Sequence, residues 1–220
     1  MAEMRAMKAR RHIGAGAALA AALLVWVQAA AADPIRLLVL GDSLTAGYGL
    51  TAEEAFPVRL EAALRAEGID AVVLNGGVSG DTTAGGRARL GWALSDNPDA
   101  AIIELGANDA LRGINPAAVY KNLDAILSRM TEAGIEVMLA GMYAPPNLGR
   151  DYGDAFYAVY TRLADEHEVD FYPFFLDGVA ARPSLNQRDF IHPNAKGVNV
   201  IVKRILPDVV ALIERSEAGD

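Results

Sequence analysis

Cysteine is absent from this chain of 220 residues. Its absence excludes disulfides, a thiol nucleophile and cysteine-ligated metal sites. No Gly-x-Gly-x-x-Gly follows the first aliphatic run and no Gly-Lys-Ser/Thr loop exists, so neither dinucleotide nor nucleoside triphosphate binding is indicated. His-Glu-x-x-His is missing too, which leaves zinc hydrolysis without support. We therefore expect neither a metal nor a cofactor.

Basic residues are also in short supply, with 20 Lys and Arg against 28 Asp and Glu, for a net charge of −8. A surface this acidic disfavours nucleic acid and anionic membranes as partners. Hydrophobic residues make up 52% of the chain, so a sizeable core is available and disorder is not expected. The length suits one domain, and nothing in the pattern requires more than a monomer.

The first 32 residues differ from the rest. Basic residues open the chain: Arg5, Lys8, Arg10 and Arg11. An apolar stretch from Ile13 to Val27 follows, and small residues then lead to Ala32, a pattern typical of a secretory signal cut after Ala30 or Ala32. The alternative, an uncleaved membrane anchor, is disfavoured because a span needs about 20 apolar residues. We expect a signal peptide over 1–32 and one domain over 33–220. The mature protein would then be periplasmic or secreted, without stable membrane insertion.

Short aliphatic runs alternate along the chain with longer amphipathic stretches. The runs predict strands at Ile35–Leu40, Ala71–Leu74, Ala100–Leu105, Ile135–Ala140 and Val169–Tyr172. The amphipathic stretches predict helices at Ala55–Ala66, Thr83–Leu94, Pro116–Ala133, Ala155–His167 and Asn194–Glu214. A Pro- and Gly-bearing loop is expected over 143–153. This alternation implies an α/β fold, a three-layer sandwich with a five-stranded parallel sheet between helices.

Three polar segments fall at the carboxyl ends of predicted strands, where parallel sheets bind ligands. These are Gly41–Leu44, Asn75–Thr82 and Gly106–Asp109. Ser43 is the candidate nucleophile, because a hydroxyl just past a strand can be activated by a neighbouring base. The alternative is a polar turn in which Ser43 only caps a helix.

His192 is the candidate base, and it is reached by elimination. His12 leaves with the signal, and His167 lies among acidic residues at a helix end, where we expect it to be solvated. A serine mechanism needs a base that titrates near neutral pH, which an imidazole does. A lone histidine beside a proline at the entrance to a helix would otherwise be a structural cap.

Asp189 is the candidate partner of His192, because a carboxylate three residues away can accept the imidazole N–H and fix its tautomer. The alternative is an exposed aspartate beside Arg188. Three other carboxylates are less convenient rivals: Asp42, Asp81 and Asp109.

Asn108 and Gly80 are the candidate oxyanion donors, together with the Ser43 N–H. A tetrahedral intermediate needs donors that already point at the developing charge. The Asn108 amide can donate from the end of the third strand, and Gly80 can offer a backbone N–H at close approach. Taken singly, both are ordinary turn residues.

Four segments, in order, resemble the four sequence blocks of the SGNH (GDSL) hydrolases: Gly41–Leu44, Gly77–Thr82, Gly106–Asp109 and Asp189–Pro193. The chain is most similar to the bacterial periplasmic thioesterase, protease and lysophospholipase type, also called arylesterases. The resemblance runs from about Ile35 to Ile213. It implies a flavodoxin-like α/β/α sandwich, a triad of Ser43, Asp189 and His192, and an oxyanion hole of Ser43, Gly80 and Asn108.

The resemblance also implies a shallow acyl site. Its movable loop would be Leu111–Pro116, with Leu111 and Ile114 as substrate contacts. The facing wall would be Tyr143–Asn147, with contacts from Tyr143, Ala144 and Pro145. Ala107 stands where some relatives carry glycine, which alters the freedom of that loop.

We therefore expect an exported serine esterase that hydrolyses acyl esters or thioesters, such as aryl esters, lysophospholipids and acyl-CoA. A carbohydrate O-deacetylase or an acyltransferase would use the same residues and stays an alternative. A non-catalytic acyl or lipid carrier is a third possibility, but it would not need all three triad residues.

Overall fold

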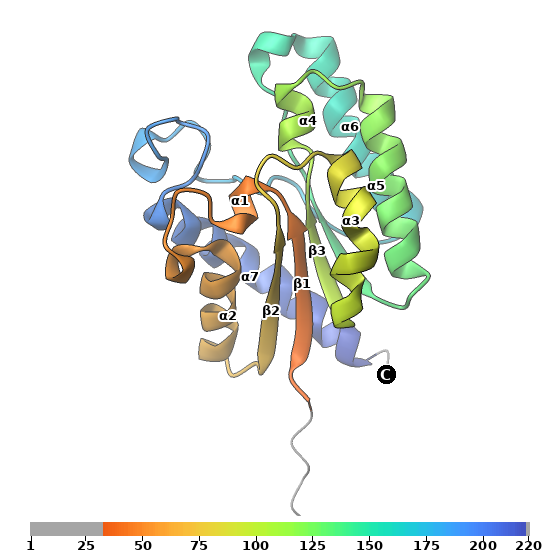
Figure 1. The fold of residues 1–220 in the computed structure, drawn as a ribbon, viewed down its shortest axis with the longest axis vertical. Coiled ribbons are helices and arrows are strands. Elements are labelled where there is room, and N and C mark those ends of the chain that lie inside the picture. Colours follow the sequence, from red (N-terminus) through yellow and green to blue (C-terminus); the bar gives the residue numbers. More distant parts are fainter. Residues whose placement is uncertain (1–32, 219–220) are drawn as a thin grey trace, which may run out of the picture. The chain divides into compact units, whose positions relative to one another are not determined.

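Five strands form one parallel sheet in the computed structural model, which describes residues 33–218 (Figure 1). The strands are β1 (Ile35–Gly41), β2 (Ala71–Gly77), β3 (Ala100–Glu104), β4 (Glu136–Ala140) and β5 (Asp170–Tyr172). Their order across the sheet is β2-β1-β3-β4-β5, the flavodoxin-like order. The predicted α/β class and parallel sheet are confirmed. The expected signal peptide, residues 1–32, lies outside the described residues.

Helices cover both faces of the sheet. They are α1 (Ser43–Ala46), α2 (Phe56–Ala66), α3 (Thr83–Ala93), α4 (Ala107–Leu111), α5 (Pro116–Thr131), α6 (Arg150–His167) and α7 (Ala195–Ala218). Short 3-10 turns lie at η1 (Ala52–Glu54), η2 (Leu94–Asp96), η3 (Pro146–Leu148) and η4 (Pro183–Leu185). α2 packs with α7 on one face, and α5 packs with α3 and α6 on the other (Figure 1).

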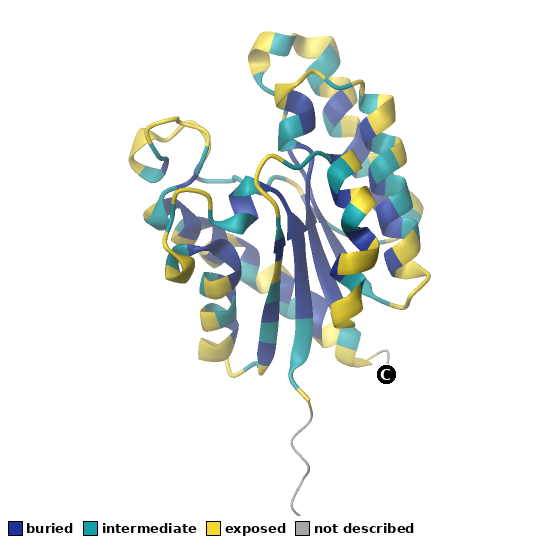
Figure 2. Ribbon diagram, viewed as in Figure 1, coloured by how far each residue is buried: buried dark blue, intermediate teal, exposed yellow. Residues whose placement is uncertain are grey.

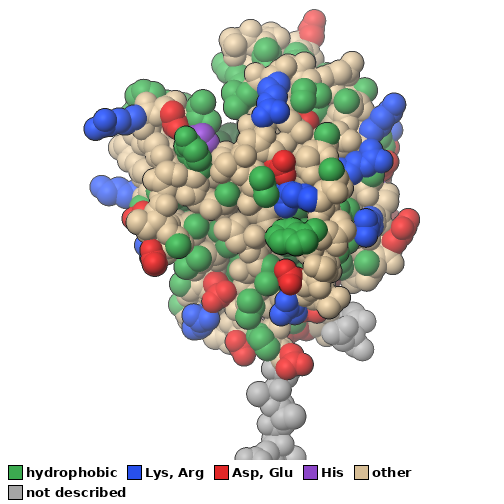
Figure 3. All heavy atoms as spheres, in the orientation of Figure 1, with side chains coloured by type: hydrophobic (Ala, Val, Ile, Leu, Met, Phe, Trp, Pro, Cys, Tyr) green, Lys and Arg blue, Asp and Glu red, His purple; other side chains and the backbone are tan. Residues whose placement is uncertain are grey.

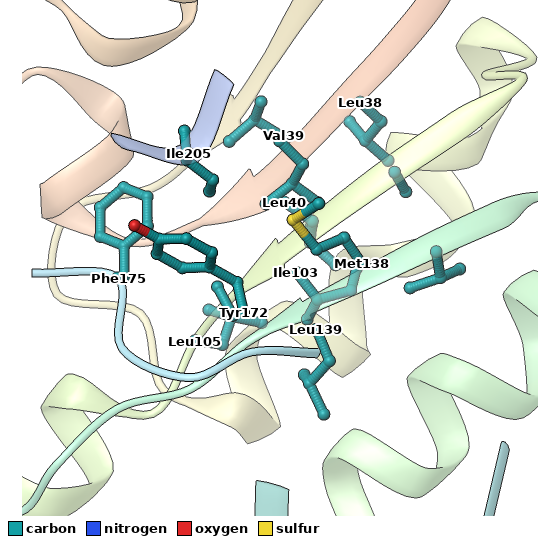
Figure 4. Close-up of a cluster of buried hydrophobic side chains, with 14 of the residues drawn as sticks. Leu38, Val39, Leu40, Ile103, Leu105, Met138, Leu139, Tyr172, Phe175 and Ile205 are labelled. Carbon is teal, nitrogen blue, oxygen red and sulfur yellow. The ribbon is translucent and has the colours of Figure 1, made fainter. Parts of the chain in front are cut away.

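The core lies on either side of β1 and β3, which occupy the middle of the sheet. Leu37 to Leu40 form a continuous aliphatic run whose side chains are all buried, as expected for a strand covered on both faces (Figure 2). Figure 4 shows Val39, Met138 and Ile205 among the buried side chains that join the sheet to α7. This core holds the carboxyl ends of the strands in fixed positions.

The structure departs from the predicted elements at a few places. β2 runs on to Gly77 because a glycine there lets the strand approach α1 closely, where a Cβ would meet the backbone of Ala46. α6 begins at Arg150 rather than Ala155, after Gly149 adopts a positive φ of 86°. α4 was not predicted at all, since five residues are too few for a periodic pattern.

Charges of both signs are interspersed on the face seen in Figure 3, with hydrophobic side chains between them. Among residues 33–218, none of the helices combines the length and hydrophobicity that a membrane crossing would take.

Candidate active site

The Ser43 segment is built at the carboxyl end of β1. β1 ends at Gly41, and Asp42 caps the short helix α1 by accepting the Leu44 N–H at 2.9 Å. Gly47, with a positive φ of 87°, ends the helix after a single turn. Ser43 is therefore the first residue of α1, a position whose N–H has no partner within the helix.

Ser43 and His192 meet in space although 149 residues separate them in the sequence. His192 Nε2 lies 2.9 Å from Ser43 Oγ, and His192 Nδ1 lies 2.7 Å from Asp189 Oδ2. An imidazole that donates from Nδ1 to the carboxylate presents its Nε2 lone pair to the serine hydroxyl. The structure thus brings together the hydroxyl, the imidazole and the carboxylate that the sequence motifs had singled out.

The Asp189 carboxylate is held by the backbone of its own loop. Its Oδ1 accepts the N–H groups of Ile191 and His192, each at 3.0 Å. Burial raises the pKa of Asp189, but these two N–H groups and the His192 ring outweigh burial and lower the pKa to about 2. Asp189 therefore stays ionised throughout the range in which an imidazole titrates.

The loop that carries His192 is tied to the segment that follows Ser43. Gln187 Nε2 donates to the carbonyl oxygens of Tyr48, at 2.7 Å, and of Pro193, at 3.0 Å. The Tyr48 ring also lies against the His192 ring, with 4.5 Å between their centroids. These contacts hold the His192 loop and the segment after Ser43 in a fixed position relative to each other.

Asn108 projects from α4, just beyond the end of β3. Gly106 precedes this helix with a φ of 120°, a conformation that favours glycine. Asn108 Nδ2 donates to Asp42 Oδ2 and to the Asp81 carbonyl oxygen, both at 2.9 Å. The amide is thereby linked to the residues next to Ser43 and Gly80.

Gly80 lies in a tight turn after β2. Asp81 N–H donates to the Val78 carbonyl oxygen at 3.0 Å, and Gly80 has a φ of 84°, as the third residue of a type II turn requires. This turn bond does not use the Gly80 N–H. The Gly80 carbonyl oxygen accepts Arg112 Nη2 at 2.9 Å, which ties the turn to the end of α4.

A largely apolar cavity of about 390 Å³ opens at the Ser43–His192 pair. Its size lies at the lower end of the range for small-molecule sites. A larger hollow of about 680 Å³ lies on the other side of the wall Tyr143–Pro146, but neither Ser43 nor His192 lines it. The smaller cavity is therefore the one connected to the reactive groups.

Comparisons with known proteins identify the family of this chain. The model of the GDSL-like Lipase/Acylhydrolase family matches residues 39–200. The chain belongs to this family.

Two curated relatives and one solved structure illustrate the similarity. An arylesterase from Vibrio mimicus is 39% identical over 193 residues, which cover 87% of this chain and 96% of the relative. Thioesterase 1/protease 1/lysophospholipase L1 of Escherichia coli (strain K12) is 41% identical over 173 residues, or 78% and 81% of the two chains. The crystal structure of AlinE4, an SGNH-hydrolase family esterase, is 44% identical with a TM-score of 0.71 and covers 83% of this chain and 98% of its own.

The hydrolase's cavity contains most of the expected substrate contacts. Leu111, Tyr143, Ala144 and Pro145 line it, whereas Ile114 packs against the core and is not among the lining residues. The Ile114 carbonyl oxygen accepts the Tyr152 hydroxyl at 2.8 Å, which holds the middle of the loop in place.

Several lining residues were not foreseen from the sequence. They are Leu44, Met142, Phe174, Leu176, Ala180, Ala181, Asn186, Phe190 and Ile191. Phe190 and Ile191 stand between Asp189 and His192, so two exposed apolar residues inside that motif were an available signal. The region from Leu176 to Ala181 gave none, since its place beside the serine depends on the tertiary fold.

The rival carboxylates are engaged elsewhere. Asp109 accepts the Thr83 hydroxyl at 2.7 Å and the Thr83 N–H at 2.8 Å. Asp81 accepts Arg89 Nε at 2.6 Å, and Arg89 Nη2 donates to the Gly41 carbonyl oxygen at 2.9 Å. Arg89, also unforeseen, therefore ties the strand end before Ser43 to the turn that contains Gly80.

The expectation that His167 is solvated is wrong. Its side chain is only 14% exposed, and Nε2 lies 2.9 Å from Asp124 Oδ1. Packing of α6 against α5 buries this ring. Within residues 33–218, no group of His, Asp and Glu side chains is arranged to hold a metal ion.

Proposed function

We propose that this hydrolase is an exported serine esterase that cleaves acyl esters and thioesters through an acyl-enzyme. The observation that carries the proposal is the unbroken series of contacts from Ser43 Oγ through His192 to Asp189. A serine hydroxyl is a weak nucleophile without such a base, and the base needs a fixed tautomer.

In the first step, His192 Nε2 takes the proton from Ser43 Oγ as this oxygen attacks the carbonyl carbon of the substrate. Asp189, ionised and bound to Nδ1, stabilises the imidazolium that forms. His192 then gives the proton to the departing alcohol or thiol, and the acyl group stays on Ser43. Water, deprotonated by His192, attacks the acyl-enzyme and releases the carboxylic acid.

The oxyanion would be held by the N–H groups of Ser43 and Gly80 and by the Asn108 amide. Ser43 N–H is free of helical bonding, and the turn bond leaves Gly80 N–H unused. Losing one such donor typically costs about 10²–10³ in kcat.

The acyl group would occupy the apolar cavity beside Ser43. A mostly apolar site of about 390 Å³ favours acyl chains longer than acetyl, and so an esterase over a carbohydrate O-deacetylase. The printed names of the relatives indicate aryl esters, lysophospholipids and acyl thioesters as the classes to test.

Export rests on the basic and apolar pattern of residues 1–32. Removal of this segment would leave a protein of the periplasm or the exterior. We propose that it acts there as a monomer, because every group of the site comes from one chain.

The test is hydrolysis of p-nitrophenyl esters from acetyl to palmitoyl, with acyl-CoA and a lysophospholipid alongside. Ser43→Ala and His192→Ala are expected to abolish turnover while the circular dichroism spectrum is unchanged. The matched control is His167→Ala, which removes the other histidine of the described region and leaves the triad intact. Full activity of Ser43→Ala would overturn the proposal, and a strict preference for acetyl esters would favour the deacetylase.

A further inference from the structure

Asp42 stands directly before Ser43 yet belongs to no part of the triad. Its side chain is completely buried. One carboxylate oxygen, Oδ1, accepts the Leu44 N–H, and the other, Oδ2, accepts Asn108 Nδ2, each at 2.9 Å. A buried carboxylate is costly unless its oxygens find donors, and this one has a donor for each.

The two acceptors around Asn108 determine which way its amide points. Nδ2 faces Asp42 Oδ2 and the Asp81 carbonyl oxygen. If the amide were rotated by half a turn, its own oxygen would face these two acceptors without a proton between them. Asp42 and the Asp81 carbonyl oxygen therefore fix the orientation of the Asn108 amide. Because they accept both of its protons, an oxyanion at Ser43 would share one of these N–H groups with its present acceptor.

Glu104, the last residue of β3, contacts Asp42 and is also fully buried. Its Oε2 accepts the Asp42 N–H at 3.4 Å, while Oε1 has no hydrogen-bond partner among the described residues. An ionised carboxylate with an unpartnered buried oxygen would be strongly disfavoured, so the neutral acid is the expected form. Burial and the neighbouring Asp42 carboxylate raise the pKa of Glu104 well above its ordinary value.

As a neutral acid, Glu104 does not repel the Asp42 carboxylate, and its Oε2 accepts the Asp42 N–H. Burial raises the pKa of Asp42 to about 6, with the Leu44 and Asn108 hydrogen bonds acting in the opposite direction. The titratable or charged groups around this carboxyl are Glu104 of β3, Asp81 of the turn before α3, Arg89 of α3, Asp109 of α4, Tyr160 of α6, and His192.

We propose that Asp42 and Glu104 are positioning residues for the oxyanion hole. Asp42 orients the Asn108 amide, and neutral Glu104 holds Asp42 in place by accepting its backbone N–H. The inference rests on the proposed role of Asn108 as an oxyanion donor. Protonation of Asp42 would replace an acceptor with a donor opposite Asn108 Nδ2, so the arrangement works only when Asp42 is ionised.

Asp42→Asn is the sharpest test, because asparagine caps helices as well as aspartate does. Its oxygen can keep the bond to the Leu44 N–H, but its NH₂ then opposes the NH₂ of Asn108. We expect kcat for p-nitrophenyl butyrate to fall about 10²-fold, as for the loss of one oxyanion donor, with little change in KM. In Asn108→Ala, which already lacks the amide, adding Asp42→Asn should cost at most a further few-fold.

The pH profile gives a second readout. In the wild type, both the Asp42 carboxyl and the imidazole must lose a proton, so log kcat/KM should approach a slope of two on its acid limb. In Asp42→Asn the slope should approach one. A purely structural role of Asp42 would lower activity without changing the slope.

Glu104 is tested by Glu104→Leu and Glu104→Gln. Leucine removes the acceptor of the Asp42 N–H and should lower kcat about tenfold, whereas glutamine, whose uncharged amide oxygen can accept this N–H, should restore most of it. The acid limb of Glu104→Gln should overlay the wild type because Glu104 does not titrate there. A limb displaced by a full pH unit would contradict a neutral Glu104, even if the leucine variant failed to fold.

The outcomes separate this inference from the proposed function. If Ser43→Ala is inactive while Asp42→Asn keeps kcat within threefold of the wild type, the esterase mechanism stands and the positioning role is overturned. The role is equally overturned if the losses from Asp42→Asn and Asn108→Ala multiply in the double variant. An active Ser43→Ala would instead remove the proposed function itself.

Discussion

At the scale of single side chains, the Asp189 and Asp42 carboxyl groups have environments that shift their pKa values in opposite directions. Asp189 has its pKa lowered to about 2 by N–H donors, whereas burial raises the pKa of Asp42 to about 6. Opposite shifts within one site are typical of groups with different tasks. Asp189 is ionised at every pH at which the imidazole can act as a base. In the proposed positioning role, Asp42 orients the Asn108 amide only at pH values at which it is itself ionised.

Asp189→Asn is expected to lower kcat by on the order of 10³–10⁴ with little effect on KM. The amide can no longer accept the Nδ1 proton as a carboxylate does, so the His192 tautomer and the imidazolium both lose support. Steady-state kinetics on p-nitrophenyl butyrate check this. Asp177→Asn, which breaks an exposed ion pair with Arg204, is the control and should retain activity. A loss of less than tenfold for Asp189→Asn would contradict the assigned role.

At the scale of elements, the junction between β3 and α4 holds Asn108 in place. Gly106 has a φ of 120°, and a Cβ there would collide with the Tyr160 hydroxyl, which donates to the Leu105 carbonyl oxygen at 2.9 Å. A side chain in place of this glycine would therefore strain the backbone and also push the Tyr160 hydroxyl away from its buried hydrogen bond.

Gly106→Ala is expected to destabilise the protein by about 3 kcal/mol, combining backbone strain with a displaced buried hydroxyl. Urea unfolding followed by fluorescence measures the change. Gly134→Ala is the matched control, because Gly134 also has a positive φ, of 75°, but has open space around its Cβ position. It should cost only about 1 kcal/mol. Equal costs for the two variants would show that the Tyr160 contact does not matter.

Most of the elements could be predicted because their signals are local. The aliphatic run of β1 and the amphipathic pattern of α5 are complete within the sequence itself. Four ordered motifs likewise indicate Ser43 and His192 from the sequence alone. α4 escaped prediction because its five residues are fixed by tertiary contacts rather than by periodicity.

The supporting residues could not be predicted for the same reason. Glu104 is the last residue of a strand, where a charged residue usually marks the surface, yet it is fully buried. In the sequence, nothing distinguishes Arg89 from other arginines of helices. Only the fold brings it to the Gly41 carbonyl oxygen, to which it donates. Ile114 was expected at the substrate because of its loop, but after α4 the chain packs its partly buried side chain against the core.

At the scale of the whole molecule, buried acidic side chains make the free energy of unfolding depend on pH. Asp42 and Glu104 have raised pKa values in the folded state, so the folded protein binds more protons than the unfolded chain once pH exceeds about 4. Their contribution to stability is therefore present in acid and is lost as pH rises through the folded-state values. Asp189 acts in the opposite direction, and its contribution is lost only as pH falls from about 4 to about 2.

Glu104→Gln should remove part of this pH dependence. The difference in free energy of unfolding between variant and wild type should favour the variant more at pH 8 than at pH 5. The reason is that glutamine, unlike Glu104, has no proton to lose as the pH rises. Urea midpoints at the two pH values measure the difference. The same offset at both pH values would mean that Glu104 titrates normally in the folded protein.

The contact between Ser43 and His192 across 149 residues also has a consequence for biosynthesis. A growing polypeptide acquires its serine early, but its imidazole is translated only shortly before the final helix, α7. Ribosome-bound or prematurely terminated products therefore contain a hydroxyl with nothing to activate it. Under the proposed mechanism, unfinished copies of the enzyme would therefore be unable to cleave esters inside the producing cell.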